Sequence, residues 1–332
     1  DFHIHSKYSR ATSREMEVET LALWAEKKGI NLLGTGDFTH PQYFAELQGA
    51  LEPAEKGLFK LRSRPSAVRF ILTVEVSNIF PVKDGVKRIH TIVFAPTFEV
   101  AEKINTRLSR LGKLGSDGRP IFGFHVKDIV KIALDASPDC LVVPAHAWTP
   151  WFGVFGSMSG FNSIKECFQE KAKYIHAIET GLSSDPKMNW RLSALDNISL
   201  VSFSDAHSAY PWRLGREGCA FELSKVTYNE IVNAIKEKDK KKFLFTVEFF
   251  PEEGKYHYDG HRNCNFSCEP SKAKELKNIC PRCNRDLTIG VMNRVEELAD
   301  RPEDYVPQNA ISFKSLVPLS ELIAAILGAT SY

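Results

Sequence analysis

Short apolar runs alternate with longer amphipathic stretches over the first three quarters of the chain. Seven runs have the length and composition of strands, at residues 2–5, 30–37, 69–77, 90–96, 140–146, 174–181 and 199–207. Between them, helical spacing places Met16, Leu21 and Trp24 on one face of a helix predicted over residues 12–29. Further helices are predicted over residues 99–112 and 224–242. Strands that alternate with helices predict an α/β fold with a largely parallel sheet.

The alternation stops near residue 249, where proline, glycine, aromatic and cysteine residues crowd together. We therefore expect a first domain over residues 1–248 and a small module over 249–290. Residues 291–332 would begin a C-terminal region that the sequence cuts short. The module carries four cysteines with the spacing C-x3-C-x11-C-x2-C, namely Cys264, Cys268, Cys280 and Cys283. This spacing is typical of a structural zinc ribbon. Four thiolates complete a tetrahedron, so we expect His257 and His261 to be surface or packing residues.

The amino-acid composition excludes few classes of protein. The 332 residues are 43% hydrophobic and 25% charged, with a net charge of +2. These values are ordinary for a globular protein and neither require nor exclude a polyanionic partner. No stretch reaches the roughly 18 apolar residues of a spanning helix, and no secretory signal is visible, so we expect a cytoplasmic location. The remaining cysteines, Cys140, Cys167 and Cys219, are then expected to be buried apolar residues.

Imidazole and carboxylate side chains lie at or near the ends of nearly all predicted strands. They are His3, His5, Asp37, His40, Glu75, His90, His146, Asp205 and His207. The carboxyl ends of barrel strands converge on one face. Residues two apart face the same side of a strand, so His3 and His5 can reach one ion while Ile4 points into the core. One such pair is often accidental. An apolar core would not tolerate this many ionisable groups without partners. The nine residues together therefore predict a site for several Zn²⁺, Mn²⁺ or Mg²⁺ ions.

The motifs DFHIHSKYS, GTGDFTH, VEVS, PAHAW and SFSDAH, taken together, resemble those of the polymerase-and-histidinol-phosphatase (PHP) superfamily. The resemblance covers residues 1–245 and implies a distorted seven-stranded (β/α) barrel that hydrolyses phosphoesters with two or three divalent ions. It also implies a ligand set in which Glu75 bridges two ions. The first ion would be held by His3, His5, Glu75 and Asp205, and the second by Glu75, His90 and His146.

The same resemblance assigns a third ion to Asp37 and His207. The chain departs from the superfamily pattern at Ala11, where many members have a ligand, and at Asp37, where many have histidine. His40 could replace a lost ligand. The resemblance places His3, His5, Asp205 and His207 in the catalytic machinery and leaves open whether Asp205 or His207 assists proton transfer.

A PHP barrel followed by the stretch EFFPEEGKYHYDGHRNC and a four-cysteine ribbon resembles the endonuclease Q family of DNA repair enzymes. This resemblance extends from Asp1 through the ribbon. It implies DNA as the partner, with cleavage on the 5′ side of deaminated bases (uracil, hypoxanthine, xanthine) or of abasic sites. Two alternatives stay open: a small-molecule phosphatase that acts on a substrate such as histidinol phosphate, and a catalytically silent PHP module that binds DNA.

An aromatic loop, AHAWTPWFGVFG, follows the candidate ligand His146. Its aromatic residues could form a small core of the loop itself. Alternatively, Trp148, Trp151 and Phe152 form a wall beside the ions that stacks on an extruded base, as in other enzymes that inspect a base. Lys7 and Arg10 are candidate phosphate contacts because they follow the first two ligands closely.

Overall fold

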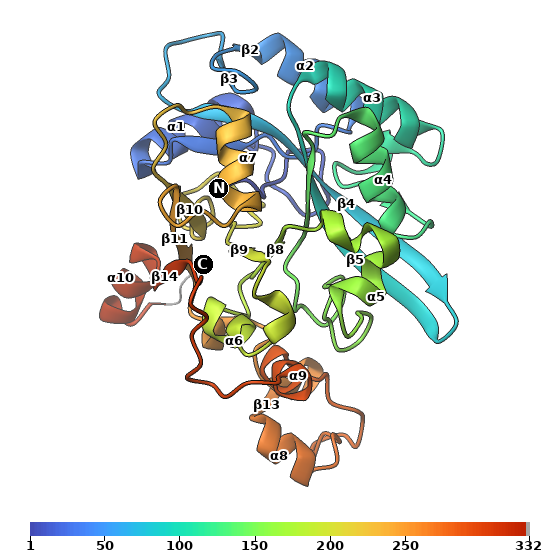
Figure 1. Cartoon of the computed structure of the whole chain (residues 1–332). Coiled ribbons are helices and arrows are strands. Elements are labelled where there is room, and N and C mark those ends of the chain that lie inside the picture. Colours follow the sequence, from blue (N-terminus) through green and yellow to red (C-terminus); the bar gives the residue numbers. More distant parts are fainter. Residues whose placement is uncertain (330–332) are drawn as a thin grey trace.

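Seven chain segments form a closed ring in the computed structural model, which describes residues 1–329. Figure 1 shows the whole chain with its elements labelled. Around the ring the segments are residues 1–5, β1 (Leu32–Gly34), β4 (Arg69–Val82), β5 (Gly85–Ala95), β7 (Leu141–Pro144), β8 (Ala177–Glu179) and β9 (Ser199–Val201). Ladders join β1 to β4, β4 to β5, β5 to β7, and β8 to β9. Backbone hydrogen bonds outside these ladders complete the circle: Gly34 N donates to Asp1 O, Ala147 N to Glu179 O, and His5 N to Ala206 O.

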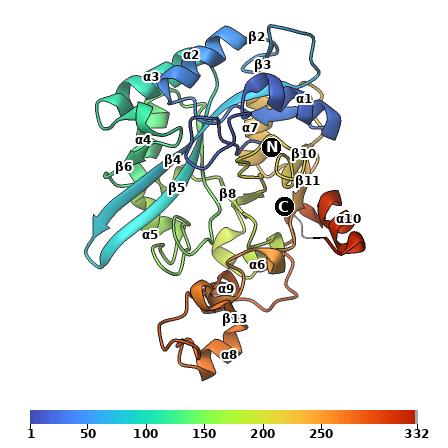
Figure 2. The ribbon, with the colours of Figure 1, turned by 180° about the vertical axis from the view of Figure 1, so that it is seen from behind.

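The ring confirms the predicted α/β fold and departs from it in two details. The first segment is extended but forms only an isolated bridge, Ile4 to Ala206, because irregular backbone flanks it. The sheet is also less parallel than predicted. β4 and β5 form a long hairpin, so β5 runs antiparallel to both β4 and β7. This hairpin projects from the body of the molecule (Figures 1 and 2).

Helices cover the outside of the ring. They are α1 (Val18–Lys28), α2 (Pro41–Ala50), α3 (Phe98–Ser109), α4 (Lys127–Ala136), α5 (Ile164–Phe168), α6 (Pro186–Trp190) and α7 (Tyr228–Lys236). Short strands β2 (Leu51–Pro53), β3 (Phe59–Leu61) and β6 (Ile121–Phe122) extend the sheet at β4. The helix predicted over residues 12–29 begins only at Val18, because the preceding residues form a turn closed by Met16 N and Ser13 O. It ends as predicted at Gly29, whose φ of 77° suits a residue without Cβ.

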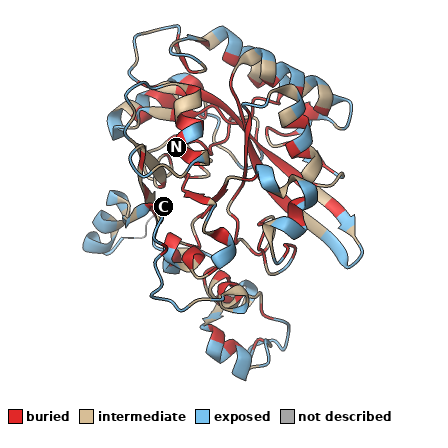
Figure 3. Ribbon diagram, viewed as in Figure 1, coloured by how far each residue is buried: buried red, intermediate tan, exposed pale blue. Residues whose placement is uncertain are grey.

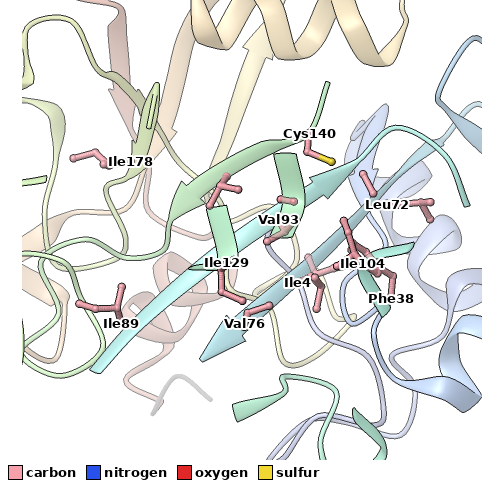
Figure 4. Packing of buried hydrophobic residues seen from close by; sticks show 14 of the residues in the cluster. Ile4, Phe38, Leu72, Val76, Ile89, Val93, Ile104, Ile129, Cys140 and Ile178 are labelled. Atoms are coloured by element: carbon pink, nitrogen blue, oxygen red, sulfur yellow. The ribbon is translucent and has the colours of Figure 1, made fainter. Parts of the chain in front are cut away.

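Apolar side chains fill the space between the ring and the helices, and the buried residues concentrate on the strands (Figure 3). Ile4 belongs to this core together with Phe38, Val76 and Val93 (Figure 4). The burial of Ile4 agrees with the predicted alternation, in which its neighbours His3 and His5 face the other way. Cys140 and Cys167 are also buried in the core, as expected, while Cys219 is half-buried against a second apolar cluster.

After residue 248 the chain forms small elements and then returns to the barrel. The elements are β12 (Asp259–His261), β13 (Phe266–Cys268), α8 (Pro270–Glu275), α9 (Val291–Leu298), β14 (Ser312–Ser315) and α10 (Leu319–Leu327). β14 pairs in parallel with β11 (Phe243–Glu248), which also pairs with β10 (Gly218–Phe221). The part beyond residue 290 therefore packs on the barrel. Within residues 1–329, no helix has the length and apolarity to cross a bilayer.

Candidate active site

Four donor atoms from three parts of the ring converge on one point. His3 Nε2 and His5 Nε2 come from the first segment, Glu75 Oε2 from β4, and Asp205 Oδ1 from the turn after β9. Glu75 Oε2 lies 3.6 Å from His3 Nε2 and 3.4 Å from His5 Nε2. Asp205 Oδ1 lies 3.5 Å from His3 Nε2 and 3.0 Å from His5 Nε2. Zinc bonds of about 2.0–2.2 Å give tetrahedral edges of roughly 3.3–3.6 Å, so these separations suit one ion.

A second group shares Glu75 with the first. Glu75 Oε1 lies 2.6 Å from His90 Nδ1 and 3.0 Å from His146 Nε2, and the two imidazole nitrogens are 3.2 Å apart. The group supplies three protein donors, which leaves room for a water or a substrate oxygen, as in catalytic metal sites. Since Glu75 uses a different oxygen for each group, it can bridge two ions.

One buried nitrogen of the first donor group makes no hydrogen bond to the described part of the chain. His3 Nε2 is buried and finds no hydrogen-bond partner anywhere in residues 1–329. An unpaired buried nitrogen is costly unless something binds it. Together with the donor geometry, this atom indicates that the residues present fit a divalent ion.

Carboxylates behind the histidines orient both rings. His3 Nδ1 lies 2.9 Å from Glu179 Oε1, and His5 Nδ1 lies 3.2 Å from Asp37 Oδ1. Glu179, at the end of β8, also accepts a 2.6 Å hydrogen bond from the backbone N–H of His146. Such carboxylate–histidine pairs fix the tautomer that leaves Nε2 free for a metal. Glu179 was not among the predicted site residues, although its position at the end of β8 follows the same rule as theirs.

The neighbours of each ionisable side chain shift its pKa and so determine its charge. Burial disfavours protonated His3, but Glu179, Asp205 and Glu75 outweigh burial and hold the pKa of His3 well above its usual value. His5 behaves in the same way: burial is outweighed by Asp205 and Asp37, and its pKa is raised. Burial alone would raise the pKa of Glu75, but His90 and Arg119 reverse this and hold it well below the usual range. Glu75 is therefore ionised and needs positive charge beside it.

The backbone at three of these residues is strained. Asp37 has φ of 48°, His146 of 30° and Asp205 of 49°, in the left-handed region that residues with Cβ rarely adopt. Each follows a strand of the ring, where the chain turns sharply. Backbone strain of this kind concentrates at functional sites, where neighbouring contacts hold the side chain in place.

The structure gives Asp37 and His40 roles other than the predicted third ion site. Asp37 accepts hydrogen bonds from Ser6 N, Ser6 Oγ and Ser9 Oγ in addition to its contact with His5, so its oxygens are already occupied. His40 caps α2, where its Nδ1 accepts from Tyr43 N. Neither residue belongs to a group of three or more converging donors within the described part of the chain. The ring of His207 lies against that of His5, with centroids 4.4 Å apart and the planes tilted by 49°, and His207 stays a candidate for proton transfer.

A cavity of about 530 Å³ opens beside the second group of donors. Its lining includes His90, His146, Asp205 and Glu179, together with Arg119, Trp151, Phe152, Leu182, Lys255 and Tyr256. The volume lies within the usual range of about 300–1,000 Å³ for ligand sites. A larger cavity of about 820 Å³ lies between residues 29–32 and β10, and neither donor group lines it. The smaller cavity is therefore the candidate substrate site.

Part of the aromatic loop belongs to the core, and part of it lines the cavity. Trp148 is 1% exposed and donates from Nε1 to Asn189 Oδ1 at 2.7 Å, so it belongs to the core and cannot stack on a substrate. Trp151 and Phe152 line the cavity instead. Tyr256, from the stretch after β11, lies 6.1 Å from Trp151 between ring centroids and completes the aromatic wall. Tyr256 lies outside every predicted strand end, and the stretch that contains it was quoted only for the family resemblance, not as part of the site.

Of the two predicted phosphate contacts, one is engaged elsewhere. Lys7 Nζ pairs with Glu17 at 2.9 Å and with Glu46 at 3.1 Å, because α1 and α2 present these carboxylates to it. Its charge is thus compensated within the protein. The side chain of Arg10 is 85% exposed, with Asp117 at 4.0 Å, and it is free to meet a phosphate.

The ribbon also differs from the prediction, in one ligand. The donors that converge are His261, Cys264, Cys280 and Cys283. His261 Nδ1 lies 3.1 Å from Cys264 Sγ and 3.3 Å from Cys283 Sγ. Cys268 lies outside this group because it pairs with Asp259 at the far end of the two-stranded ladder, about 7 Å along the strand from the pair His261–Phe266.

Comparison with known proteins gives sequence relatives of unassigned activity. No protein-family model matches the chain. It is 32% identical over 188 residues to an uncharacterized protein of Methanocaldococcus jannaschii, a match that covers 55% of this chain and 23% of that protein. It is 28% identical over 326 residues to the uncharacterized protein YqxK of Bacillus subtilis, covering 93% of this chain and 79% of that protein. The chain thus spans under a quarter of the archaeal relative and most of the bacterial one.

Two solved structures resemble the chain over nearly its whole length. One is the lesion-specific endonuclease PfuEndoQ from Pyrococcus furiosus, with a TM-score of 0.86 and 34% identity, covering 99% of this chain and 78% of that chain. The other is endonuclease Q in complex with a 27-mer duplex substrate with an abasic lesion at the active site. Its TM-score is 0.87 at 34% identity, covering 99% of this chain and 79% of that chain. The likeness therefore includes the elements after residue 248 as well as the barrel.

Proposed function

The chain belongs to the endonuclease Q family, and from this membership we propose that it is a metal-dependent endonuclease that cuts DNA beside a damaged nucleotide. The observation that carries the proposal is the pair of donor groups that share Glu75, whose members His90, His146 and Asp205 line a cavity with aromatic walls. A shared carboxylate suits two ions held close together, which is the arrangement of many phosphodiesterases.

The residues of the chain have distinct roles in this proposal. His3, His5, Glu75 and Asp205 would hold one ion, and Glu75, His90 and His146 would hold the other. Such ions supply an activated water and positive charge for the phosphate oxygens. Glu179 and Asp37 orient the rings of His3 and His5. We assign His207, which is one-third exposed beside His5, to proton transfer, while Asp205 acts as a ligand.

We further propose that the cavity receives the damaged nucleotide after it leaves the base stack. Trp151, Phe152 and Tyr256 offer aromatic surface, and a flipped base is usually held by such stacking together with hydrogen bonds to its edge. The proposed substrates are DNA strands that contain uracil, hypoxanthine, xanthine or an abasic site, with the cut on the 5′ side of the lesion. Because the substrate is genomic DNA, we place the protein in the cytoplasm, with one structural Zn²⁺ in the ribbon.

The test uses end-labelled duplexes that carry a single deoxyuridine, deoxyinosine or abasic site, incubated with Mn²⁺, Mg²⁺ or Zn²⁺. We expect a cut at the lesion that disappears in the His3→Ala, His5→Ala double variant. The matched control is His176→Ala, since His176 lies outside both donor groups. The proposal is wrong if the protein leaves every lesion intact or if the double variant cuts equally well. Hydrolysis of histidinol phosphate without DNA cleavage would identify a small-molecule phosphatase instead.

A further inference from the structure

Arg119 places a positive charge directly at the shared carboxylate. Its Nη1 donates to Glu75 Oε2 at 2.9 Å, the same oxygen that faces His3 and His5. The side chain is 26% exposed and lines the 530 Å³ cavity beside His90 and His146. Arg119 lies in an irregular loop before β6, so neither strand periodicity nor ligand spacing marks it in the sequence.

The loop that carries Arg119 is anchored on both sides. Pro120 O accepts a 3.0 Å hydrogen bond from Ser77 N on β4, and Arg119 N donates to Asp117 Oδ1 at 3.1 Å. Gly118 N donates to Tyr8 O at 3.0 Å, near the first two ligands. Gly118 also packs so closely on Asp37 Oδ2 that a Cβ would collide with it. The guanidinium is thus presented to the site from a fixed backbone.

Most hydrogen-bonding capacity of this guanidinium is unused by the protein. Arginine offers five N–H donors. Across residues 1–329, the one side-chain acceptor that meets them is Glu75. The remaining donors are not buried orphans, since none of the guanidinium nitrogens is a buried atom without a partner. They therefore face the cavity, where an anion with two oxygens could accept a fork of hydrogen bonds.

The charges around the site indicate what that anion is. Four carboxylates surround the two donor groups: Glu75, Asp205, Glu179 and Asp37. Two divalent ions would balance these four negative charges. Arg119, which donates to Glu75 and lines the cavity, then leaves one positive charge in excess there. A phosphodiester carries one negative charge and gains a second as an oxygen attacks it, so the excess charge matches the reacting group.

We propose that Arg119 is a catalytic residue that binds a non-bridging oxygen of the scissile phosphate and stabilises the charge that develops on it. This inference rests on the proposed function and adds a direct protein contact to the reacting phosphate. Lys255 is exposed at the cavity rim and is placed to meet DNA at a distance from the ions. Arg119 is set among the ligands, where a guanidinium acts on the reaction itself.

The first experiment compares Arg119→Gln and Arg119→Lys with wild type in single-turnover cleavage of a lesion duplex. Loss of one donor to a developing charge typically costs about 10²–10³ in rate. We expect a loss of that size for Arg119→Gln, a partial recovery for Arg119→Lys, and DNA affinity within about threefold of wild type. Arg107→Gln is the control, because Arg107 pairs with Asp135 on the surface far from the cavity. Cleavage by Arg119→Gln at the wild-type rate would overturn the proposal.

Two binding measurements separate this role from a structural one. Mn²⁺ titration by calorimetry should give Arg119→Gln an affinity no weaker than wild type, since the guanidinium competes for Glu75. An affinity weakened tenfold would make Arg119 a support of the ion site and contradict the proposal. In the second measurement, a neutral methylphosphonate replaces the scissile phosphate, and binding is followed by fluorescence anisotropy with Ca²⁺. The replacement should weaken DNA binding at least fivefold in wild type and much less in Arg119→Gln. Equal weakening in both proteins would also contradict the proposal.

If wild type cuts no duplex, the proposed function fails while the role of Arg119 stays measurable. Inorganic phosphate is then titrated into the Mn²⁺-loaded protein. A phosphate affinity at least fivefold weaker in Arg119→Gln than in wild type would support Arg119 as a phosphate contact in an enzyme of another substrate class. Equal affinities would overturn the assignment of Arg119 as well.

Discussion

Glu179 Oε1 lies 2.9 Å from the Nδ1 of His3, a residue 176 positions earlier in the chain. The pair joins the first segment of the ring to β8 through two fully buried side chains. It explains how a strand-end histidine can present Nε2 to an ion in one fixed orientation. The same logic applies to His5 and Asp37, so each histidine of the opening pair has its own buried carboxylate.

The first prediction concerns Glu179→Gln. The amide keeps the shape of the side chain but loses the charge that supports His3. Removal of such a partner usually costs 10- to 100-fold in metal affinity. We expect Mn²⁺ affinity, measured by calorimetry, to fall by about that factor. Glu102→Gln on the exposed face of α3 serves as control. Unchanged affinity in Glu179→Gln would show that the pair does not support ion binding.

The second prediction concerns the number of ions. Asp37 is saturated by Ser6, Ser9 and His5, so we expect two ions in the barrel and one in the ribbon. Asp37→Asn should keep that number and bind the barrel ions more weakly. Elemental analysis after dialysis measures the stoichiometry. The loss of one complete equivalent in Asp37→Asn would restore the third site that superfamily resemblance implied.

The third prediction concerns the ribbon. Cys264→Ser should lose the structural zinc, and His261→Ala should lose it or hold it much more weakly, because both donate to the converging group. Cys268→Ser should retain it. Zinc content and melting temperature report the outcome together, since a structural zinc site contributes directly to folding. Retention by His261→Ala with loss in Cys268→Ser would support the four-cysteine arrangement.

The fourth prediction links the C-terminal elements to the cavity. Arg294 on α9 is 6% exposed and donates to Phe155 O at 3.0 Å, to Phe161 O at 3.2 Å and to Asn162 Oδ1 at 2.6 Å. These contacts hold the loop that carries Trp151. Arg294→Met would leave buried acceptors unpaired, at about 1–3 kcal/mol each.

We therefore expect Arg294→Met to lower the free energy of unfolding by about 2–4 kcal/mol in urea denaturation. The KM for lesion DNA should rise more than kcat falls, because the loop and not the ion site is disturbed. Arg285→Met, on the exposed surface of the ribbon, provides the comparison. A variant as stable as wild type with unchanged KM would mean that α9 does not position the loop.

The fifth prediction concerns pH. The pKa values of His3 and His5 are raised in the folded protein, so their contribution to stability is fully present below the unfolded histidine pKa of about 6.5. It is lost as the pH rises through the folded values. Burial lowers the pKa of His90 to about 4. His90 therefore changes the stability only below pH 6.5, because above that pH it is neutral in both the folded and the unfolded protein.

The melting temperature of metal-free protein should therefore fall as the pH rises from 6.5 to 9. Added Mn²⁺ should raise it more at pH 8.5 than at pH 6.5, since ions replace the protons on the same nitrogens. A scanning calorimetry series with and without Mn²⁺ measures both trends. Metal-free protein that becomes more stable over this range would contradict the assigned charge states.

Several features could be predicted from the sequence because they follow from strand geometry. The two-residue spacing of His3 and His5 and the position of Asp205 just after a strand are properties of short segments. Glu179 satisfied the same rule and was overlooked. Glu75 was expected near a strand end and lies in the middle of β4, because this strand continues into the long hairpin. Arg119 could not be found in this way, since an irregular loop has no periodicity and its approach to Glu75 depends on long-range packing. The converging group of the ribbon contains His261 in place of Cys268 because of the register between β12 and β13. The spacing of the cysteines does not determine this register.

The position of the cut on a duplex with one lesion decides whether this protein is a lesion-specific endonuclease. A 5′-labelled strand that contains a single deoxyinosine is incubated with Mn²⁺ and resolved beside size markers. We predict one product that ends at the phosphodiester immediately 5′ of the lesion. The product should be absent from the undamaged duplex, after removal of divalent ions, and in the His3→Ala, His5→Ala variant. Equal cleavage of damaged and undamaged strands, or cleavage without divalent ions, would contradict this account.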